Sequence, residues 1–215
     1  MKCVIGIDPG ASGALCLISE DRSRIEILRI KSRGWAASAA LVMGWNQQYE
    51  IVFSGIEHVH AHTRDDKKTI FTFGENTGRV KGWFDVINKE LTPIESQNWL
   101  RHFSLYGLRS KFMAAGMSEG KARTAAKQQY VLKAETVFKP EMARIRVADI
   151  RGPNHVTSDM ADAMLIAQYL WDITFSGGRR HVVKKFCAAC EYDISFGKHT
   201  CDIFSGVKTN TDRRN

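Results

Sequence analysis

The stretch that most constrains this chain is VIGIDPGASGALCLI, residues 4 to 18. Two apolar runs of strand length flank a turn that contains Pro9 and Gly10, residues that favour a tight reversal between strands. Asp8 interrupts the apolar pattern where the first run ends. The pattern predicts two antiparallel strands with an acid at one end, although Asp8 could also be a turn-forming aspartate before Pro9 and Gly10.

The rest of the chain, to about residue 175, predicts one α/β domain. The segment RIEILRI, residues 24 to 30, alternates like a third strand of an antiparallel meander. A helix over 35–48 and a buried strand over 51–57 form a crossover unit, so the fourth strand should lie parallel to the first. The remaining expected elements are helices at roughly 74–89, 96–105, 118–136 and 157–172 and a short strand in LTPIES, 91–96.

Composition narrows the class of protein. With 215 residues, 44% of them hydrophobic and 25% charged, the chain is typical of a soluble globular domain of ordinary size. No apolar run approaches the roughly 20 residues that span a bilayer, and the N-terminus lacks the features of a signal peptide, so we expect an intracellular protein without membrane contact. The formal net charge of +8 suits a polyanion partner such as nucleic acid, or else a solvated basic surface.

Acids stand at the ends of three buried elements. If the first and fourth strands are parallel neighbours, Asp8 and Glu57 emerge at the same edge of the sheet. A spacing of three residues places Asp159 and Asp162 on one face of the last helix. Four carboxylates packed together repel one another unless cations neutralise them, and Mg²⁺ prefers such oxygen ligands. Since two metal ions can stabilise both the attacking and the leaving oxygen of a phosphoryl displacement, the cluster predicts a nuclease.

Other interpretations remain open at this stage. Glu57 could lie on a solvated strand end, and Asp159 could interact with the dipole at the helix N-terminus. Asp162 is flanked by apolar residues, where an unpaired charge is costly. An actin-like kinase also has a loop resembling DPGASGA, but it needs a second related half, for which 215 residues leave no room. A non-catalytic DNA-binding module explains the charge but not the positions of the acids.

The ordered motifs IGIDPGASGA, IEHVHA and DMADAMLIA resemble those of the RuvC-type Holliday junction resolvases, in the ribonuclease H-like superfamily. The resemblance spans roughly residues 3 to 172, includes GRVKGW and ESQNWLRHFSL, and looks closest to the shorter bacteriophage and organellar members. It implies a five-stranded mixed sheet flanked by helices. It also implies a homodimer that acts on four-way DNA junctions, with the helix at 74–89 at the interface between the two subunits. Cleavage of flaps or forks is the alternative.

The resemblance also implies the site. The catalytic acids would be Asp8, Glu57, Asp159 and Asp162, holding two Mg²⁺ ions, with Mn²⁺ as a substitute. Hydrolysis of the phosphodiester would leave 5′-phosphate and 3′-hydroxyl ends. His155 lies close enough in sequence to assist.

DNA contacts are expected from several segments. Bacterial members have a phenylalanine shortly after the strand-four acid, where it wedges into the junction; this chain has His60 there, and Phe71 is a second substitute. Several basic side chains are candidates for neutralising DNA phosphates, and the alternative for each is a solvated surface charge. They are Lys81, Arg109, Lys111, Arg123, Lys127, Arg179, Arg180, Lys184 and Lys185.

The last 40 residues differ in kind from the rest. From Gly177 to Asn215 there are eight Lys or Arg against four Asp or Glu, so we expect a basic appendage over 176–215 after a nuclease domain over 1–175. A Cys₃His set in this segment could form a structural zinc site, although its His-x-Cys half is tighter than the common ligand spacing. Its members are Cys187, Cys190, His199 and Cys201. Reduced, partly exposed thiols are the alternative.

Overall fold

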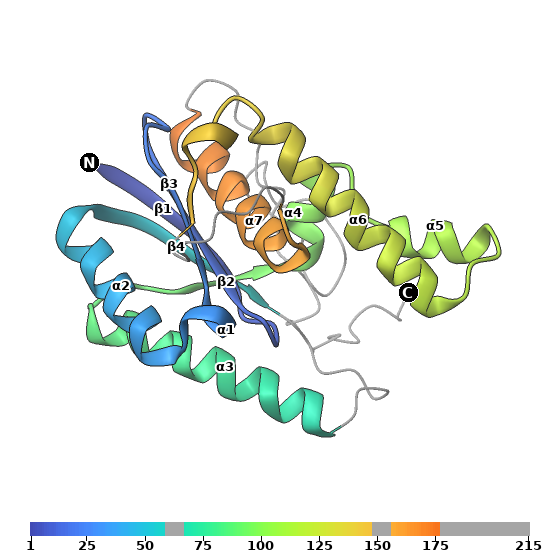
Figure 1. Cartoon of the computed structure of the whole chain (residues 1–215), viewed down its shortest axis with the longest axis horizontal. Helices are drawn as coiled ribbons and strands as arrows, with labels where there is room; N and C mark the ends of the chain where they lie inside the picture. Colours follow the sequence, from blue (N-terminus) through green and yellow to red (C-terminus); the bar gives the residue numbers. More distant parts are fainter. Residues whose placement is uncertain (59–66, 148–155, 177–215) are drawn as a thin grey trace, which may run out of the picture. The chain divides into compact units, whose positions relative to one another are not determined.

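The two apolar runs around Pro9 and Gly10 form adjacent antiparallel strands at the centre of a mixed sheet. The strands are β1 (Lys2–Asp8), β2 (Ala14–Ser19), β3 (Ile25–Arg29), β4 (Glu50–His58), β5 (Thr92–Glu95) and the two-residue β6 (Arg146–Val147). They lie in the order β5-β4-β1-β2-β3-β6, with β4 parallel to both β1 and β5, and β6 parallel to β3 (Figure 1). The predicted five-stranded mixed sheet is therefore confirmed, and β6 extends it at one edge.

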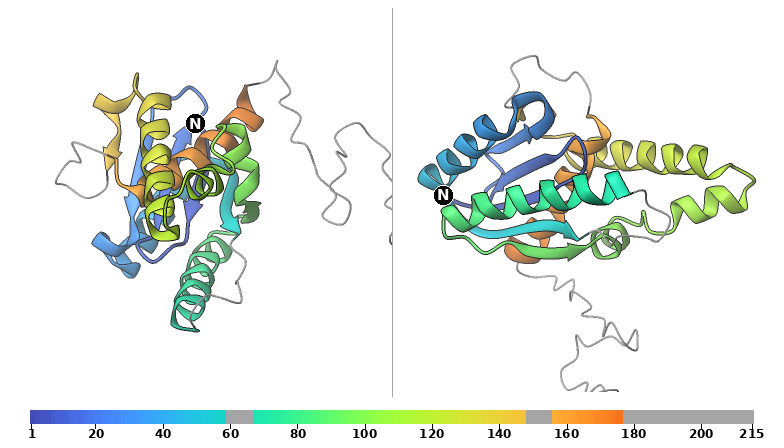
Figure 2. Two further views of the ribbon diagram at one scale, coloured as in Figure 1. Left: turned by 90° about the vertical axis from the view of Figure 1, so that its right-hand side faces the viewer. Right: turned by 90° about the horizontal axis from the view of Figure 1, so that it is seen from below.

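The computed structural model describes residues 1–58, 67–147 and 156–176. Its helices are α1 (Ile30–Arg33), α2 (Trp35–Gln48), α3 (Lys67–Val86), α4 (Ser96–His102), α5 (Leu108–Ala114), α6 (Glu119–Val137) and α7 (Ser158–Phe175), with a 3₁₀ turn at Met142–Arg144. Figure 2 shows α2 and α3 on one face of the sheet and α7, beside α4 and α6, on the other. Within these ranges no helix has the length and apolar character needed to cross a bilayer.

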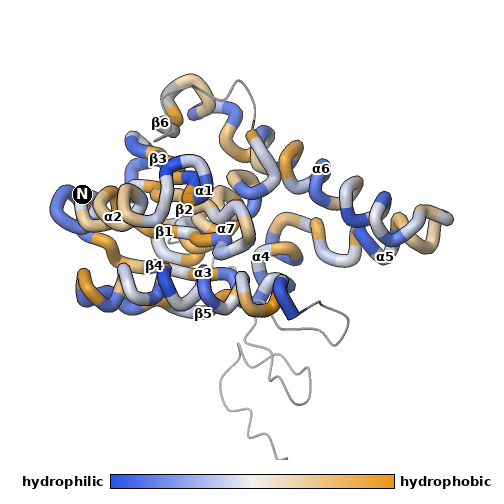
Figure 3. Tube along the Cα trace, turned by 60° about the horizontal axis from the view of Figure 1, so that its bottom comes forward, coloured by the Kyte–Doolittle hydropathy of each residue, from blue (hydrophilic) through white to orange (hydrophobic). Residues whose placement is uncertain are grey.

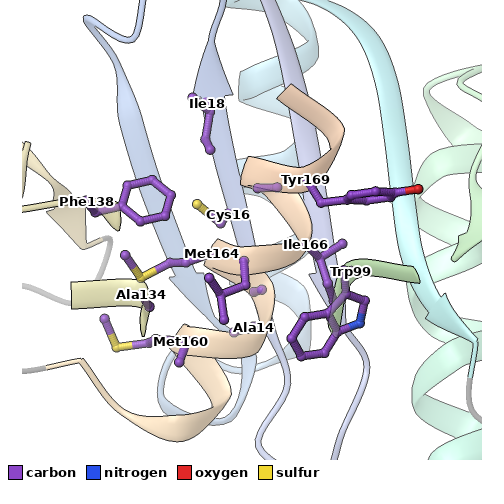
Figure 4. Packing of buried hydrophobic residues seen from close by; sticks show 14 of the residues in the cluster. Ala14, Cys16, Ile18, Trp99, Ala134, Phe138, Met160, Met164, Ile166 and Tyr169 are labelled. Carbon is purple, nitrogen blue, oxygen red and sulfur yellow. The ribbon is translucent and has the colours of Figure 1, made fainter. Parts of the chain in front are cut away.

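Alternation along the strands divides the core into two layers. Odd-numbered residues of β1, such as Ile5 and Ile7, pack with the apolar side chains of α2 and α3. Even-numbered residues of β1 and β2 face α7, and Figure 4 shows Cys16 on this side near Met164. Asp8 continues the even-numbered series, so its carboxylate belongs to the face of the sheet that α7 covers.

Two glycines allow α7 to lie directly on the sheet. A Cβ atom added to Gly6 would be 2.2 Å from the backbone nitrogen of Ala167 and 2.7 Å from the carbonyl oxygen of Ala163. A Cβ atom at Gly55 in β4 would be 2.9 Å from a methyl group of Leu170. Because Gly6 and Gly55 have no side chain, the backbone of α7 lies against β1 and the side chain of Leu170 lies against β4.

The predicted elements differ from the observed ones mainly on the surface. α3 begins at Lys67 rather than near residue 74, because its first turns are exposed and show no core-facing period. α5 lies in a stretch for which the sequence predicts no helix; it has no buried residue, so it shows no apolar period. The other predicted helices and strands agree with the structure to within a few residues.

Candidate active site

The sheet brings the first two predicted acids to one edge. In the parallel pairing of β1 with β4, Ile7 lies opposite Ile56, so Asp8 and Glu57 are the next residues of the two strands. Asp8 is buried, with 8% of its surface exposed, and its Oδ1 accepts a hydrogen bond of 2.9 Å from the backbone N–H of Gly10. This bond fixes the carboxylate to the turn that follows β1.

The first turns of α7 place the other two acids near the ends of β1 and β3. Asp162 is 1% exposed, and one residue further along the helix Ala163 contacts β1 at Gly6. Asp159, one turn earlier, accepts a 3.3 Å hydrogen bond from the Nε–H of Arg29 and forms an ion pair with it. Contact of α7 with Gly6, two residues before Asp8, therefore holds Asp162 close to the end of β1.

Lys127 lies against one of these acids, Asp162. Its ammonium group, on α6, donates a hydrogen bond to Oδ2 of Asp162 and forms an ion pair with it. The same group lies 5.5 Å from the ring centroid of Tyr130, a distance suited to a cation–π interaction. Sequence reasoning assigned Lys127 to DNA; the structure places it against the acids, with 39% of its side chain exposed.

The surroundings of the buried acids change their pKa values. Burial, together with the negative charges of Asp162 and Glu57, raises the pKa of Asp8 to about 8. Burial raises the pKa of Asp162 to about 6; Lys127 opposes this change, while Glu57 and Asp159 add to it. Burial acts to lower the pKa of Lys127, but Asp162 outweighs it and the pKa is raised. One lysine therefore does not neutralise the cluster.

Two residues that sequence reasoning missed support the cluster. Arg29, which pairs with Asp159, ends β3 opposite Ala14, and Ala14 is itself opposite Asp8. The predicted meander could have revealed this placement. Asn76 on α3 is 7% exposed and donates a 3.1 Å hydrogen bond to the carbonyl of Gly10. Asn76 is four residues before the buried Val80, so the two lie on the same face of α3. A polar residue on that face could have indicated the role of Asn76.

The donor set fits a hard divalent cation. The side chains are all carboxylates, and Oδ1 of Asp162 is buried with no hydrogen-bond partner among the described residues. In the described ranges, no three His, Cys, Asp or Glu side chains are grouped closely enough to hold a metal ion. The carboxylates would therefore have to draw together around an ion, and the Oδ1 atom of Asp162 would give up no hydrogen bond within the described residues on binding it.

Some of the predicted DNA-binding residues lie within the described ranges. Lys81, Lys111 and Arg123 are exposed, whereas Arg109 forms an ion pair with Glu119. Phe71 is 72% exposed at the start of α3. The other predicted residues lie outside the described ranges: His60, His155, Arg179, Arg180, Lys184 and Lys185, and the proposed zinc ligands Cys187, Cys190, His199 and Cys201.

The strand order, with an antiparallel meander followed by two parallel strands and a helix packed on the central strand, defines a ribonuclease H-like fold. Solved structures similar to this chain include the resolvases that its motifs resemble. Thermus thermophilus RuvC in complex with a Holliday junction substrate has 14% sequence identity and a TM-score of 0.49, over 82% of this chain and 97% of that one.

Two further solved structures have similar values. Another T. thermophilus RuvC structure gives 12% identity and a TM-score of 0.43, over 81% of this chain and 96% of that one. The yeast mitochondrial Holliday junction resolvase Ydc2 has 14% sequence identity and a TM-score of 0.42, over 86% of this chain and 84% of that one. No protein-family model and no curated protein matches the sequence. The chemistry of the site is therefore inferred from its own side chains.

Proposed function

We propose that this protein is a metal-dependent endonuclease that hydrolyses phosphodiester bonds in branched DNA, with the four-way junction as its main substrate. The observation that carries the proposal is the placement of the acids: Asp8 and Glu57 end adjacent parallel strands, and the contact of α7 with Gly6 holds Asp162 close to them, with Asp159 one turn away. Burial and neighbouring negative charges raise the pKa of both Asp8 and Asp162. Four carboxylates, two of them buried, with only Lys127 and Arg29 as cationic partners are unfavourable in the protein alone. This arrangement is explained if the cluster exists to hold cations that also contact substrate phosphate.

The side chains of the chain have distinct tasks in this reaction. Asp8 is oriented by the N–H of Gly10, so its carboxylate is held in place before substrate arrives. Asp162, on α7, offers an oxygen that has no hydrogen-bond partner among the described residues. Lys127, partly exposed, is able to attract a phosphate into the acid cluster while it remains in contact with Asp162.

Mg²⁺ fits the carboxylates and, when bound, would supply charge stabilisation for the attacking and leaving oxygens of an in-line displacement. Water is the attacking group in this proposal, and the products carry 5′-phosphate and 3′-hydroxyl ends. The ligands would be Asp8, Glu57, Asp159 and Asp162. No covalent intermediate with the protein is required.

The choice of a four-way junction depends on the sequence motifs and on the charge of the chain. The motifs resemble those of junction resolvases, and a formal net charge of +8 favours a substrate in which several duplexes bring phosphates together. Paired nicking of such a junction needs two active sites, so a homodimer with α3 at its interface is part of the proposal. α3 has exposed apolar side chains, with Phe71 at 72% and Val86 at 70%.

One experiment compares cleavage of a synthetic four-way junction, a Y-fork and a plain duplex, each with Mg²⁺ and with a chelator. We expect Mg²⁺-dependent cleavage that is fastest on the junction. Faster cleavage of the fork would favour a broader branched-DNA nuclease. Binding without cleavage of any substrate would favour a non-catalytic junction-binding protein and would contradict the assignment of the acids.

A further inference from the structure

The hairpin of α5 and α6, residues 108–137, projects away from the sheet, as Figures 1 and 2 show. Its outer end carries exposed apolar side chains: Met113, near the end of α5, is 45% exposed, and Met117, in the turn between the helices, is 41% exposed. Figure 3 shows the apolar outer end beside strongly hydrophilic residues. Exposed apolar side chains gathered at a projecting point indicate a contact surface rather than a part of the core.

The charge around the two methionines indicates the partner. Over residues 108–137 the sequence has six Lys or Arg and two acids, Glu119 and Glu135, and Glu135 is 18 positions from Met117. Glu119 forms an ion pair with Arg109, so its charge is already neutralised. The exposed Lys111, Lys121 and Arg123 form no ion pair within the described part of the chain. Such a surface attracts a polyanion and repels a second copy of itself.

The position of the turn relative to the acids sets the reach of this surface. Lys127, which contacts Asp162, and Met117 are separated by ten residues of sequence, most of them in α6. At about 1.5 Å per residue this corresponds to about 15 Å. Because each base pair occupies about 3.4 Å of a duplex, the turn lies about four base pairs from a phosphate held at the acids.

We propose that Met113 and Met117 pack against a base step of the DNA arm that leads away from the cleaved phosphate. Lys111, Lys121 and Arg123 hold the backbone phosphates beside them. The inference rests on the proposed function, and adds to it an apolar contact with bases at a place distinct from the acid cluster. Methionine is among the side chains that proteins insert as apolar wedges between base steps.

The test compares a Met113→Ser/Met117→Ser double variant with the wild-type protein in binding to two junctions in Ca²⁺. One junction has arms of about ten base pairs, and the other has arms of about three, too short to reach the turn. We expect the double variant to bind the long-armed junction about tenfold more weakly and the short-armed junction like the wild type. Its salt slope should be unchanged, because the cations remain.

The matched control is Leu132→Ser, which removes an apolar side chain that is 53% exposed on α6, in the same hairpin but far from the turn. This variant should bind both junctions like the wild type. Equal binding by the double variant and the wild type would overturn the inference, as would an equal loss on both junctions. A change of oligomeric state in the double variant, measured by sedimentation, would also overturn it, because the turn would then contact a second copy.

Failure of this inference differs from failure of the proposed function. If the wild-type protein cuts the long-armed junction with Mg²⁺ and the double variant binds it equally well, only the contact at the methionines is wrong. If the wild-type protein neither binds nor cuts the junction, the proposed function fails and the inference fails with it.

Discussion

Gly6 of β1 and Ala167 of α7 are in backbone contact, so close that a Cβ atom on Gly6 would lie 2.2 Å from the nitrogen of Ala167. This contact determines how near the acids of α7 come to the acid that ends β1. Asp8 is two positions after Gly6, and Asp162 is five positions before Ala167. The geometry of the site therefore depends on a glycine that bears no functional group.

Gly6→Ala should weaken both the fold and the activity. The atoms that the new methyl group meets belong to the backbone of α7 and cannot rotate away, so we expect the free energy of unfolding to fall by about 3 kcal/mol. Cleavage should fall further than stability explains, because α7 is displaced from Asp8. Urea unfolding and junction cleavage measure the two effects.

The control for this variant is Gly44→Ala within α2, where the nearest atom to an added Cβ is the side-chain nitrogen of Gln48 at 4.0 Å. Helix propensity should raise the free energy of unfolding of this variant by about 0.5 to 1 kcal/mol. If Gly6→Ala were as stable as the wild type, the close approach of α7 to β1 would be wrong.

Asn76→Ala should slow cleavage while leaving junction binding intact. The substitution removes the hydrogen bond that α3 donates to the carbonyl of Gly10, so the turn that orients Asp8 loses a support worth about 1 kcal/mol. We expect a lower kcat with an unchanged dissociation constant for the junction. Thr77→Val is the matched control, since the Thr77 hydroxyl has no hydrogen-bond partner among the described residues. A kcat for Asn76→Ala equal to that of the control would remove Asn76 from the site.

Much of the fold was predictable because its signals are local. Alternation in the strands around Pro9 and Gly10, helical spacing over 35–48 and the crossover rule together predicted the meander and the parallel β4. These signals come from residues that face a core. α5 has no buried residue and the first turns of α3 are exposed, so no apolar pattern marks these segments as helices in the sequence.

The acids were predictable from the sequence, but their supports were not. The four carboxylates interrupt apolar patterns, which made them visible one at a time. The role of Lys127 depends on how α6 packs beside α7, a tertiary contact that residue spacing alone does not encode. The same is true of Asn76, whose partner is 66 residues away in the chain.

The stability of the protein without metal should decrease as the pH rises from about 4 to about 8. The pKa of Asp8 is raised from 3.8 to about 8 in the folded state by burial and by the neighbouring acids, so in this interval the folded protein retains a proton that the unfolded chain has lost. The free energy of unfolding then falls with increasing pH. Asp162 acts in the same direction up to about pH 6.

Urea unfolding in a chelator at several pH values measures this dependence, and Asp8→Asn isolates the part due to Asp8. The variant should lose less stability than the wild type between pH 4 and pH 8, and Mg²⁺ should stabilise the wild type most at the upper end. Identical pH slopes for the variant and the wild type would show that Asp8 does not carry a raised pKa.

Lys127→Met should destabilise the protein without metal at pH 8, because Asp162 then loses the ammonium group that it contacts. Since the lysine side chain is 39% exposed, we expect a loss of about 1 to 3 kcal/mol rather than the larger cost of a fully buried pair. Saturating Mg²⁺ should recover part of the loss. Lys121→Met, on the exposed surface of the same helix, serves as the control and should be neutral. Equal stability of the two variants would contradict the pairing of Lys127 with Asp162.

The most direct test of the account is the rate of junction cleavage in Mg²⁺ by four variants, each with one acid made neutral: Asp8→Asn, Glu57→Gln, Asp159→Asn and Asp162→Asn. The account predicts that every variant binds the junction at least as tightly as the wild type but cuts it more than about a hundredfold more slowly. Cleavage at the wild-type rate by any of the four, or cleavage by the wild type in a chelator, would contradict it.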